Sequence, residues 1–308
     1  MLRLVLQVIP PLRRTLAAGT VTAAVVSLLA GCSTPSADVA LPRKNQAAWV
    51  LPLDQYVAPT VDRSQLAVQI LAQDCLRTAG YTWRVSMDQL AARPGESWNA
   101  ANRKLFNGAL AEKYGYGNSD RTDLSSAARQ RVLDDDAANR TLADAAPEAV
   151  DRCMNQAQKR LGQTQKSSYL LAEELAVAAS EDSANDSTVR AAARRWRTCM
   201  ASAGVPDLPS TPEDMPPRSI SSLRPAVDEV TPVGAETDVP AEERRVAVAD
   251  AACQESSGWA KASYDAEWAA EADAMRKHAD ELERNAAAAE STERRAENII
   301  ASHAPQSE

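Results

Sequence analysis

Cys75-Leu76-Arg77-Thr78-Ala79-Gly80-Tyr81 recurs without a gap as Cys199-Met200-Ala201-Ser202-Ala203-Gly204-Val205. Each stretch places a cysteine near the end of a predicted helix, shortly before a glycine that can take the left-handed conformation of a helix terminus. Each is followed by a variable loop and then by a predicted helix with a further cysteine, Cys153 or Cys253. The chain therefore contains an internal repeat, and we expect an all-α fold built around it.

The order of these four cysteines favours one pairing. An even number of cysteines in an exported chain indicates disulfides, and four cysteines allow three connectivities. Because the repeat opens at one cysteine and closes at the next, we expect Cys75–Cys153 and Cys199–Cys253. In the loop-entropy model each bridge stabilises the fold by roughly 4 kcal/mol. That is a large share of a domain's net stability of about 5–15 kcal/mol, so the bridges are expected to decide folding.

Tryptophans accompany the cysteines. Trp196 lies three residues before Cys199, and Trp83 and Trp259 follow closely after Cys75 and Cys253. Aromatic residues are scarce in the chain, which has six Trp, six Tyr and one Phe. We therefore expect each of these tryptophans to cover a bridge. The alternative is that they form exposed platforms for sugar rings.

The N-terminus carries the features of an export signal. Arg3, Arg13 and Arg14 precede an uncharged apolar tract, residues 16–30, which ends in Leu29-Ala30-Gly31-Cys32. A basic region, a short apolar region and small residues at the cut are typical of a secretory signal. The tract is shorter than the ~20 apolar residues that a membrane span needs, which favours a signal over a membrane helix.

The cysteine at the end of this signal resembles the lipobox of bacterial lipoproteins. The resemblance implies cleavage before Cys32 and attachment of diacylglycerol to its thiol, which anchors the protein outside the cell through its new N-terminus. Arg13-Arg14 faintly resembles a twin-arginine export signal, but an ordinary basic region is the preferred interpretation.

The chain that remains after removal of the predicted signal is acidic. The leader holds three of the 34 basic residues and none of the 42 acidic ones, so the remainder has 31 basic residues and a net charge of −11. This charge argues against nucleic acid as a partner.

We expect a signal peptide (residues 1–31), a lipidated tether (32–50), a first disulfide-bonded helical half (51–165) and a second half (166–308). The second half contains a Pro-rich loop (205–240) and a long terminal helix.

Apolar periodicity and capping residues predict the helices. They fall near residues 62–79, 102–113, 123–143, 147–161, 168–180, 188–204, 240–258 and 262–300. Leu51 to Tyr56 is too short and Pro-interrupted for an α-helix, and we expect it to pack against the core. In the last helix Trp268, Met275, Leu282 and Ala289 repeat every seven residues. Such a seam favours packing within the chain, with pairing to another helical protein as the alternative.

Motifs for catalysis and metal binding are missing. The only histidines, His278 and His303, lie far from the cysteines, so neither zinc nor Cys-His chemistry has suitable ligands. Asp134-Asp135-Asp136 lacks the alternation of a calcium loop and fits a solvated helix face. We therefore predict no catalytic residue, no metal and no cofactor.

Several stretches resemble a family of secreted actinobacterial lipoproteins. They are Leu51-Pro52-Leu53-Asp54, Cys75 to Tyr81, Lys113-Tyr114-Gly115-Tyr116-Gly117, Trp196-Arg197-Thr198-Cys199-Met200 and Ala249-Asp250-Ala251-Ala252-Cys253. The resemblance covers most of residues 50–300 and implies a helical domain outside the cell. It offers no catalytic residues to carry over.

The function we expect is a non-catalytic binding or interaction protein on the outer face of the cytoplasmic membrane. Its partners would be the membrane, through Cys32, and another envelope protein or a cell-wall component. Two alternatives stay open. One is a solute-binding lipoprotein of a transporter, although such proteins are usually α/β and no βαβ alternation is present. The other is a cell-wall hydrolase that uses two carboxylates.

Overall fold

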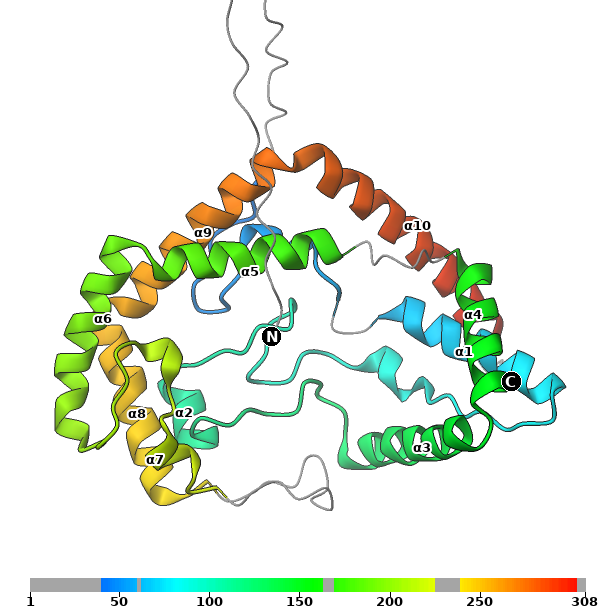
Figure 1. Ribbon diagram of the computed structural model, residues 1–308, viewed down its shortest axis with the longest axis horizontal. Helices are drawn as coiled ribbons and strands as arrows, with labels where there is room; N and C mark the ends of the chain where they lie inside the picture. Colours follow the sequence, from blue (N-terminus) through cyan, green and yellow to red (C-terminus); the bar gives the residue numbers. More distant parts are fainter. Residues whose placement is uncertain (1–39, 60–61, 163–168, 225–238, 304–308) are drawn as a thin grey trace, which may run out of the picture. The chain divides into compact units, whose positions relative to one another are not determined.

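A computed structural model describes residues 40–59, 62–162, 169–224 and 239–303. Cys32, the predicted signal and part of the Pro-rich loop lie outside the described residues. Within them the chain forms ten α-helices, short 3₁₀ turns and no strand beyond isolated β-bridges, which confirms the all-α prediction (Figure 1). The helices are α1 (Arg63–Thr78), α2 (Gly108–Tyr114), α3 (Ser126–Ala145), α4 (Pro147–Leu161), α5 (Leu170–Ala184), α6 (Ser187–Met200), α7 (Arg218–Ser221), α8 (Ala241–Ser256), α9 (Trp259–Lys277) and α10 (Ala279–His303).

Both predicted disulfides are present. Cys75–Cys153 joins α1 to α4 and Cys199–Cys253 joins α6 to α8, with Cα–Cα distances of 5.6 and 5.7 Å. The two linked helix pairs also pack directly against each other, α1 on α4 and α6 on α8. The repeat in the sequence therefore corresponds to a repeat in the structure, in which a disulfide joins the end of one helix to a later helix.

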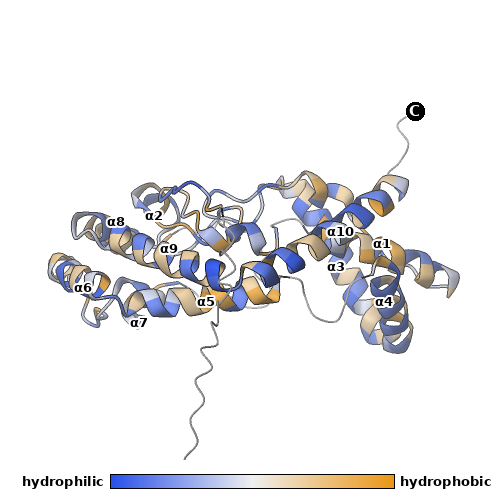
Figure 2. Cartoon of the chain, turned by 90° about the horizontal axis from the view of Figure 1, so that it is seen from above, coloured by the Kyte–Doolittle hydropathy of each residue, from blue (hydrophilic) through white to orange (hydrophobic). Residues whose placement is uncertain are grey.

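The first bridge lies in a cluster of apolar side chains. Leu76, Trp83, Ala149, Val150 and Cys153 are buried together beside Cys75. Along the rest of α1, Leu66, Ile70 and Leu71 form a core with α4 and with Ala296 and Ile300 of α10. The terminal helix of the second predicted half thus covers helices of the first half, and the hydropathy colouring in Figure 2 shows apolar and polar residues interleaved along these helices.

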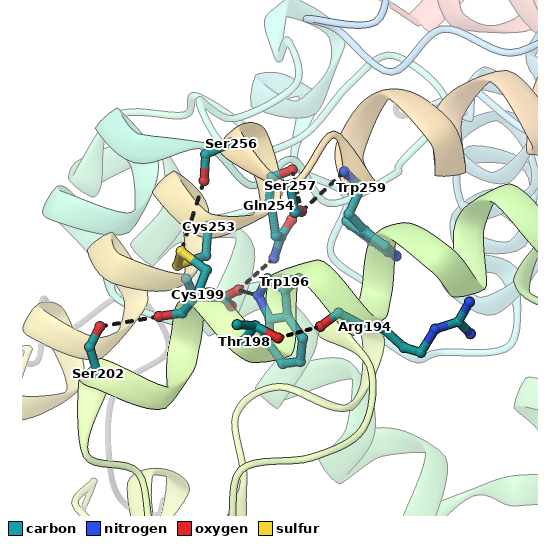
Figure 3. Close-up of a disulfide and its surroundings, with 11 residues drawn as sticks. Arg194, Trp196, Thr198, Cys199, Ser202, Cys253, Gln254, Ser256, Ser257 and Trp259 are labelled. Atoms are coloured by element: carbon teal, nitrogen blue, oxygen red, sulfur yellow. Dashed lines mark hydrogen bonds between the residues drawn. A yellow bond between two sulfur atoms is a disulfide. The ribbon is translucent and has the colours of Figure 1, made fainter.

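The second bridge has a tryptophan at its centre. Trp196 is fully buried in a cluster with Met200, Val246, Cys253 and Ile220. Figure 3 shows Trp196 beside the Cys199–Cys253 bridge. Ile220 comes from α7, so the described part of the Pro-rich loop packs onto α6 and α8. This part of the loop contains the 3₁₀ turn Pro212–Asp214 and the short helix α7.

Leu51 to Tyr56 packs into the core as expected. Its central residues form a 3₁₀ turn, Pro52–Tyr56, and Leu51 and Leu53 are fully buried. Leu53 and Tyr56 meet Met275 and Leu282, while Leu51 meets Tyr264 and Trp268. The entrance to the domain is therefore held by the α9–α10 region.

The helix expected over residues 262–300 is divided. The backbone at His278 leaves the helical conformation (φ −115°, ψ 18°), so α9 ends at Lys277 and α10 runs from Ala279 to His303. The long C-terminal helix is α10. The heptad-like seam is buried within the chain, because Trp268, Met275, Leu282 and Ala289 are each less than a tenth exposed. Intramolecular packing is thus the correct interpretation of the seam.

Local capping explains where other helices begin. The Asp62 carboxylate accepts a hydrogen bond from the Gln65 amide (3.1 Å), so α1 starts where the sequence predicted. The helix expected over 102–113 begins later, at Gly108. Asn102 has φ +58°, outside the right-handed helical region, and Asn107 caps the helix by accepting from the Leu110 amide (3.0 Å). Residues before Asn107 are then free to form an irregular loop.

Candidate binding site

A cavity of about 640 Å³ opens among segments that are distant in sequence. We call it the aromatic cavity. Its walls come from the entrance of the domain, the loop before α2, the Tyr116 turn, the Pro-rich loop and the α8–α9 junction. The lining residues are Gln46, Ala47, Trp49, Lys104, Leu105, Phe106, Asn107, Gly108, Tyr116, Pro212, Met215, Asp250, Ala251, Gln254, Glu255, Trp259 and Ala260. A concave apolar site with a few converging polar groups is typical of a ligand pocket.

Trp49 is held in the cavity wall in a strained backbone conformation. Its φ is +45°, a region that costs an aromatic residue roughly 1–2 kcal/mol. Surrounding contacts compensate for this strain: Asn99 donates a side-chain hydrogen bond to the Trp49 carbonyl (3.1 Å), and the indole N–H donates to Glu267 (2.9 Å). The Trp49 ring also meets Tyr264 edge-on, with 5.4 Å between centroids. Strain of this kind is concentrated at functional sites in proteins.

Tyr116 forms another part of the cavity wall, where its ring stacks on the ring of Phe106. The two ring centroids are 5.7 Å apart and the ring planes differ by 8°. The Tyr116 hydroxyl donates to the Asp250 carboxylate (3.1 Å), and the Lys104 ammonium donates to the Tyr116 carbonyl (2.6 Å). These contacts fix the orientation of the phenol ring at the edge of the cavity.

Asp250 is a fully buried carboxylate behind this ring. One of its oxygens accepts from the indole N–H of Trp196 (2.7 Å) and from the Gln254 amide (3.0 Å), and the other accepts from Tyr116. Burial raises the pKa of Asp250, and these hydrogen bonds oppose the rise only in part. Burial and the adjacent Asp250 raise the pKa of Tyr116, so its hydroxyl stays a proton donor. Asp250 thereby links the second disulfide cluster to the cavity.

A second buried carboxylate holds the Tyr116 turn in place. Glu243 is paired with Arg224 through two hydrogen bonds of 2.7 Å, and it also accepts from the Tyr116 backbone amide (2.8 Å). Gly115, at φ +58°, has no room for a side chain, because a Cβ there would lie 2.5 Å from the Glu243 carboxylate. The short Gly-Tyr-Gly motif is therefore shaped by its packing on α8.

Behind Trp49 lies a cluster of three carboxylates around one guanidinium. Arg103 donates to Asp54 (2.9 Å), Glu267 (3.1 Å) and Glu271 (2.6 Å). Glu271 is fully buried and also accepts from the Leu53 amide (2.8 Å). Burial raises the pKa of Glu271 to about 7, and the Arg103 charge offsets that effect only in part. This cluster joins the entrance of the domain and the 99–103 loop to α9.

A larger cavity, of about 800 Å³, lies along α10. Three of its polar lining residues are engaged in hydrogen bonds: Tyr56 donates to Glu283 (2.7 Å), and Glu293 accepts from Ser64 (2.7 Å). The aromatic cavity differs in having stacked rings, a strained tryptophan and a buried carboxylate at one place. We therefore regard it as the candidate functional site.

The described residues show no arrangement typical of metal binding or membrane crossing. No group of three or more His, Cys, Asp or Glu side chains among them is placed to hold a metal ion. In the same residues, no helix is both long enough and apolar enough to span a bilayer. The chemistry that this arrangement offers is the enclosure of a ligand by rings and fixed hydrogen-bonding groups.

The structure shows where the tryptophans and the aspartate run singled out in the sequence lie. Trp83 and Trp196 each pack beside a disulfide, as predicted. Trp259 does not, because it packs on Val189, Ala192 and Ala193 of α6, and its buried indole N–H has no hydrogen-bond partner among the described residues. All three rings are buried, which leaves none as an exposed sugar platform. The Asp134 to Asp136 run lies on α3, with Asp134 and Asp136 exposed.

Three residues of the cavity escaped sequence reasoning. Trp49 falls in the predicted tether, and Phe106 in the helix predicted over residues 102–113, whereas the structure places it in the loop before α2. Asp250 stands in the sequence only as part of the stretch Ala249 to Cys253, with no role assigned to it, yet it is fully buried. The one available signal was the tyrosine between Gly115 and Gly117, since flanking glycines allow a close approach of the backbone.

Comparisons with known protein families, with curated proteins and with solved structures find no match for this chain. The resemblance to secreted actinobacterial lipoproteins therefore stays a prediction from the motifs.

Proposed function

We propose that this protein is a non-catalytic binding protein of the cell envelope, anchored through lipid on Cys32 to the outer face of the cytoplasmic membrane. The aromatic cavity is its ligand site. The observation that carries this proposal is the strained, fully braced Trp49 in the wall of a cavity that five distant chain segments build together.

The two disulfides support a location outside the cytoplasm. Disulfides persist in oxidising compartments and are rare where glutathione and thioredoxin keep thiols reduced. The bridges at Cys75–Cys153 and Cys199–Cys253 therefore agree with export by the predicted signal. The net charge of −11 that remains after signal removal suits a domain that stays in solution beside an anionic membrane.

The buried carboxylates support binding more than catalysis. Asp250, Glu243 and Glu271 each accept two or three hydrogen bonds from the protein itself, which fixes them as structural acceptors. A hydrolase needs one such carboxyl group facing its substrate. We therefore prefer a receptor to a hydrolase. The helical fold also gives no support to the α/β architecture usual for solute-binding proteins.

Saturable binding of a neutral, environment-sensitive dye such as Nile red tests the cavity. Gly108→Trp is the blocking variant, because Gly108 lines the cavity and a Cβ there meets no atom within 4 Å. Ala109→Trp is the control, since Ala109 is exposed on the same helix and does not line the cavity. The full-length protein in non-ionic detergent is used throughout.

We expect the wild type and Ala109→Trp to bind the dye in the same way and Gly108→Trp to bind it several-fold more weakly. Equal binding by all three proteins would place the dye outside the aromatic cavity and would refute the proposed site.

A further inference from the structure

Two of the rings in the aromatic cavity hydrogen-bond to carboxylates behind them. The Tyr116 hydroxyl donates to Asp250 (3.1 Å) and the Trp49 indole donates to Glu267 (2.9 Å). A ring whose O–H or N–H donates to an anion gains electron density, so its face attracts positive charge more strongly. The polar aromatic walls therefore present a negative potential to the cavity.

The carboxylate at Asp250 lacks a positive partner. Its donors are the neutral groups of Trp196, Gln254 and Tyr116, and no Lys, Arg or His of the described chain forms an ion pair with it. By contrast, Glu243 has Arg224 and Glu267 has Arg103. A buried charge without a counter-charge is costly, and a cation bound nearby lowers that cost.

Two further charged residues, Glu255 and Lys104, lie in the wall of the aromatic cavity. Glu255 adds a second carboxylate to the lining, and its side chain is exposed at the rim. Lys104 is the only basic residue of the lining, and its ammonium is directed to the Tyr116 carbonyl at 2.6 Å. The lining thus combines stacked rings with an excess of negative charge.

We propose that the group recognised in the aromatic cavity is an organic cation, a substituted ammonium on a small apolar body, held by Trp49, Phe106 and Tyr116. Asp250 acts through Tyr116, whose hydroxyl donates to the carboxylate (3.1 Å). This assignment rests on the proposed function and names the class of ligand. Rings that enclose a substituted ammonium are a known solution for such ligands.

Three isosteric probes test the assignment. Choline carries the substituted ammonium. In 3,3-dimethylbutan-1-ol (dimethylbutanol) a carbon atom replaces the choline nitrogen, and 3,3-dimethylbutyrate (dimethylbutyrate) carries a carboxylate on the same branched body. Each is titrated into the full-length protein in non-ionic detergent, with tryptophan fluorescence as the readout. We expect choline to bind about tenfold more tightly than dimethylbutanol, and dimethylbutyrate to bind most weakly.

Phe106→Leu is the variant, because it removes a ring from the wall but keeps an apolar side chain of similar reach. We expect it to reduce the preference for choline over dimethylbutanol to about threefold or less. Glu255→Gln tests the rim charge without changing shape, and it is expected to weaken choline about twofold and to leave dimethylbutanol unchanged. Near-ultraviolet circular dichroism confirms that both variants are folded.

The outcomes separate the two proposals. Equal binding of choline and dimethylbutanol, or tightest binding of dimethylbutyrate, would overturn the cationic assignment while the cavity remained a binding site. Absence of binding by all three probes, in protein that still binds Nile red, would overturn it as well. Loss of Nile red binding to the cavity would remove the proposed function itself.

Discussion

At the scale of single residues, Asp250 connects the core to the cavity. It joins Trp196, which packs beside the second disulfide, to Tyr116, which lines the cavity. A carboxylate in this position is stable only while its donors stay in place, because a buried charge that loses a hydrogen bond is strongly destabilising. The stability of the fold and the shape of the site therefore depend on the same side chain.

Trp196→Phe tests this dependence. The substitution removes the indole donor 2.7 Å from Asp250 in a fully buried position. We expect the free energy of unfolding to fall by about 3 kcal/mol. Trp83→Phe is the matched control, since the Trp83 indole donates to the neutral Gln69 (2.6 Å), and its loss should cost about 1 kcal/mol. Urea denaturation measures both; equal losses would mean that the Asp250 charge is unimportant.

Glu271 gives the fold a pH dependence. The pKa of Glu271 is about 7 in the folded state and 4.5 in the unfolded state. Between these two pH values the folded state keeps a proton on Glu271 that the unfolded state has released. The corresponding stability is fully present below the unfolded pKa and is lost as pH rises toward 7.

Glu271→Gln removes this titration. Between about pH 5 and 7 we expect the wild type to lose stability with a slope steeper than the variant's by on the order of 1 kcal/mol per pH unit. Urea midpoints across this pH range give the slopes. Parallel curves for the two proteins would show that Glu271 titrates normally in the folded state.

At the scale of elements, the sequence was most informative where the signal is local. The cap at Asp62 and the stop glycine Gly80 placed the ends of α1 correctly, and the order of the cysteines in the repeat predicted both disulfides. The helix expected to end at Gly204 ends at Met200 instead, and a 3₁₀ turn, Ala201–Ala203, leads to the glycine. The break at His278 carries no Gly or Pro, so the apolar periodicity ran through it and predicted a single helix.

The aromatic cavity could not be predicted in the same way. Its walls come from residues as far apart as Trp49 and Ala260, and apolar periodicity reports only which face of one helix is buried. The pairing of Trp49 with Glu267 spans 218 residues of sequence. Such contacts arise from tertiary packing, and a single sequence contains no local record of them.

The two disulfides are expected to differ in their effect on the site. Replacing either pair by serine should cost about 4 kcal/mol in the loop-entropy model. Cys199–Cys253 joins the helices that carry Trp196 and Asp250, whereas Cys75–Cys153 lies in a separate cluster with Trp83. At a temperature where both variants are folded, we expect Cys199→Ser/Cys253→Ser to weaken Nile red binding and Cys75→Ser/Cys153→Ser to leave it unchanged. Equal weakening of Nile red binding by both double variants would show that the site does not depend on the second bridge in particular.

At the scale of the whole molecule, the proposed lipid anchor at Cys32 precedes the domain that contains the aromatic cavity. Eighteen residues of sequence connect Cys32 to Leu51, the first buried residue of the described chain. Tyr264 accepts from the Asn45 amide (2.9 Å) and donates to the Val50 carbonyl (2.8 Å), which fixes the end of this connection to α9. The C-terminal part of the predicted tether is thus a structural part of the domain and of its cavity wall.

Cys32→Ser tests the anchor. We expect the variant to accumulate as an unprocessed precursor without lipid, because the thiol is the attachment point that the lipobox resemblance implies. Intact-protein mass spectrometry of the membrane fraction measures the signal and the lipid together. A mass for the wild type that lacks diacylglycerol, or unchanged processing of the variant, would contradict a lipid anchor.

Native mass spectrometry of the protein isolated from its own cell envelope is the most direct test of ligand binding in the aromatic cavity. The wild type, Ala109→Trp and Gly108→Trp are compared in the same detergent. We predict a small organic cation bound to the first two proteins and absent from the third. An unliganded mass for the wild type, or an adduct that Gly108→Trp retains, would contradict the central claim that the aromatic cavity is the binding site.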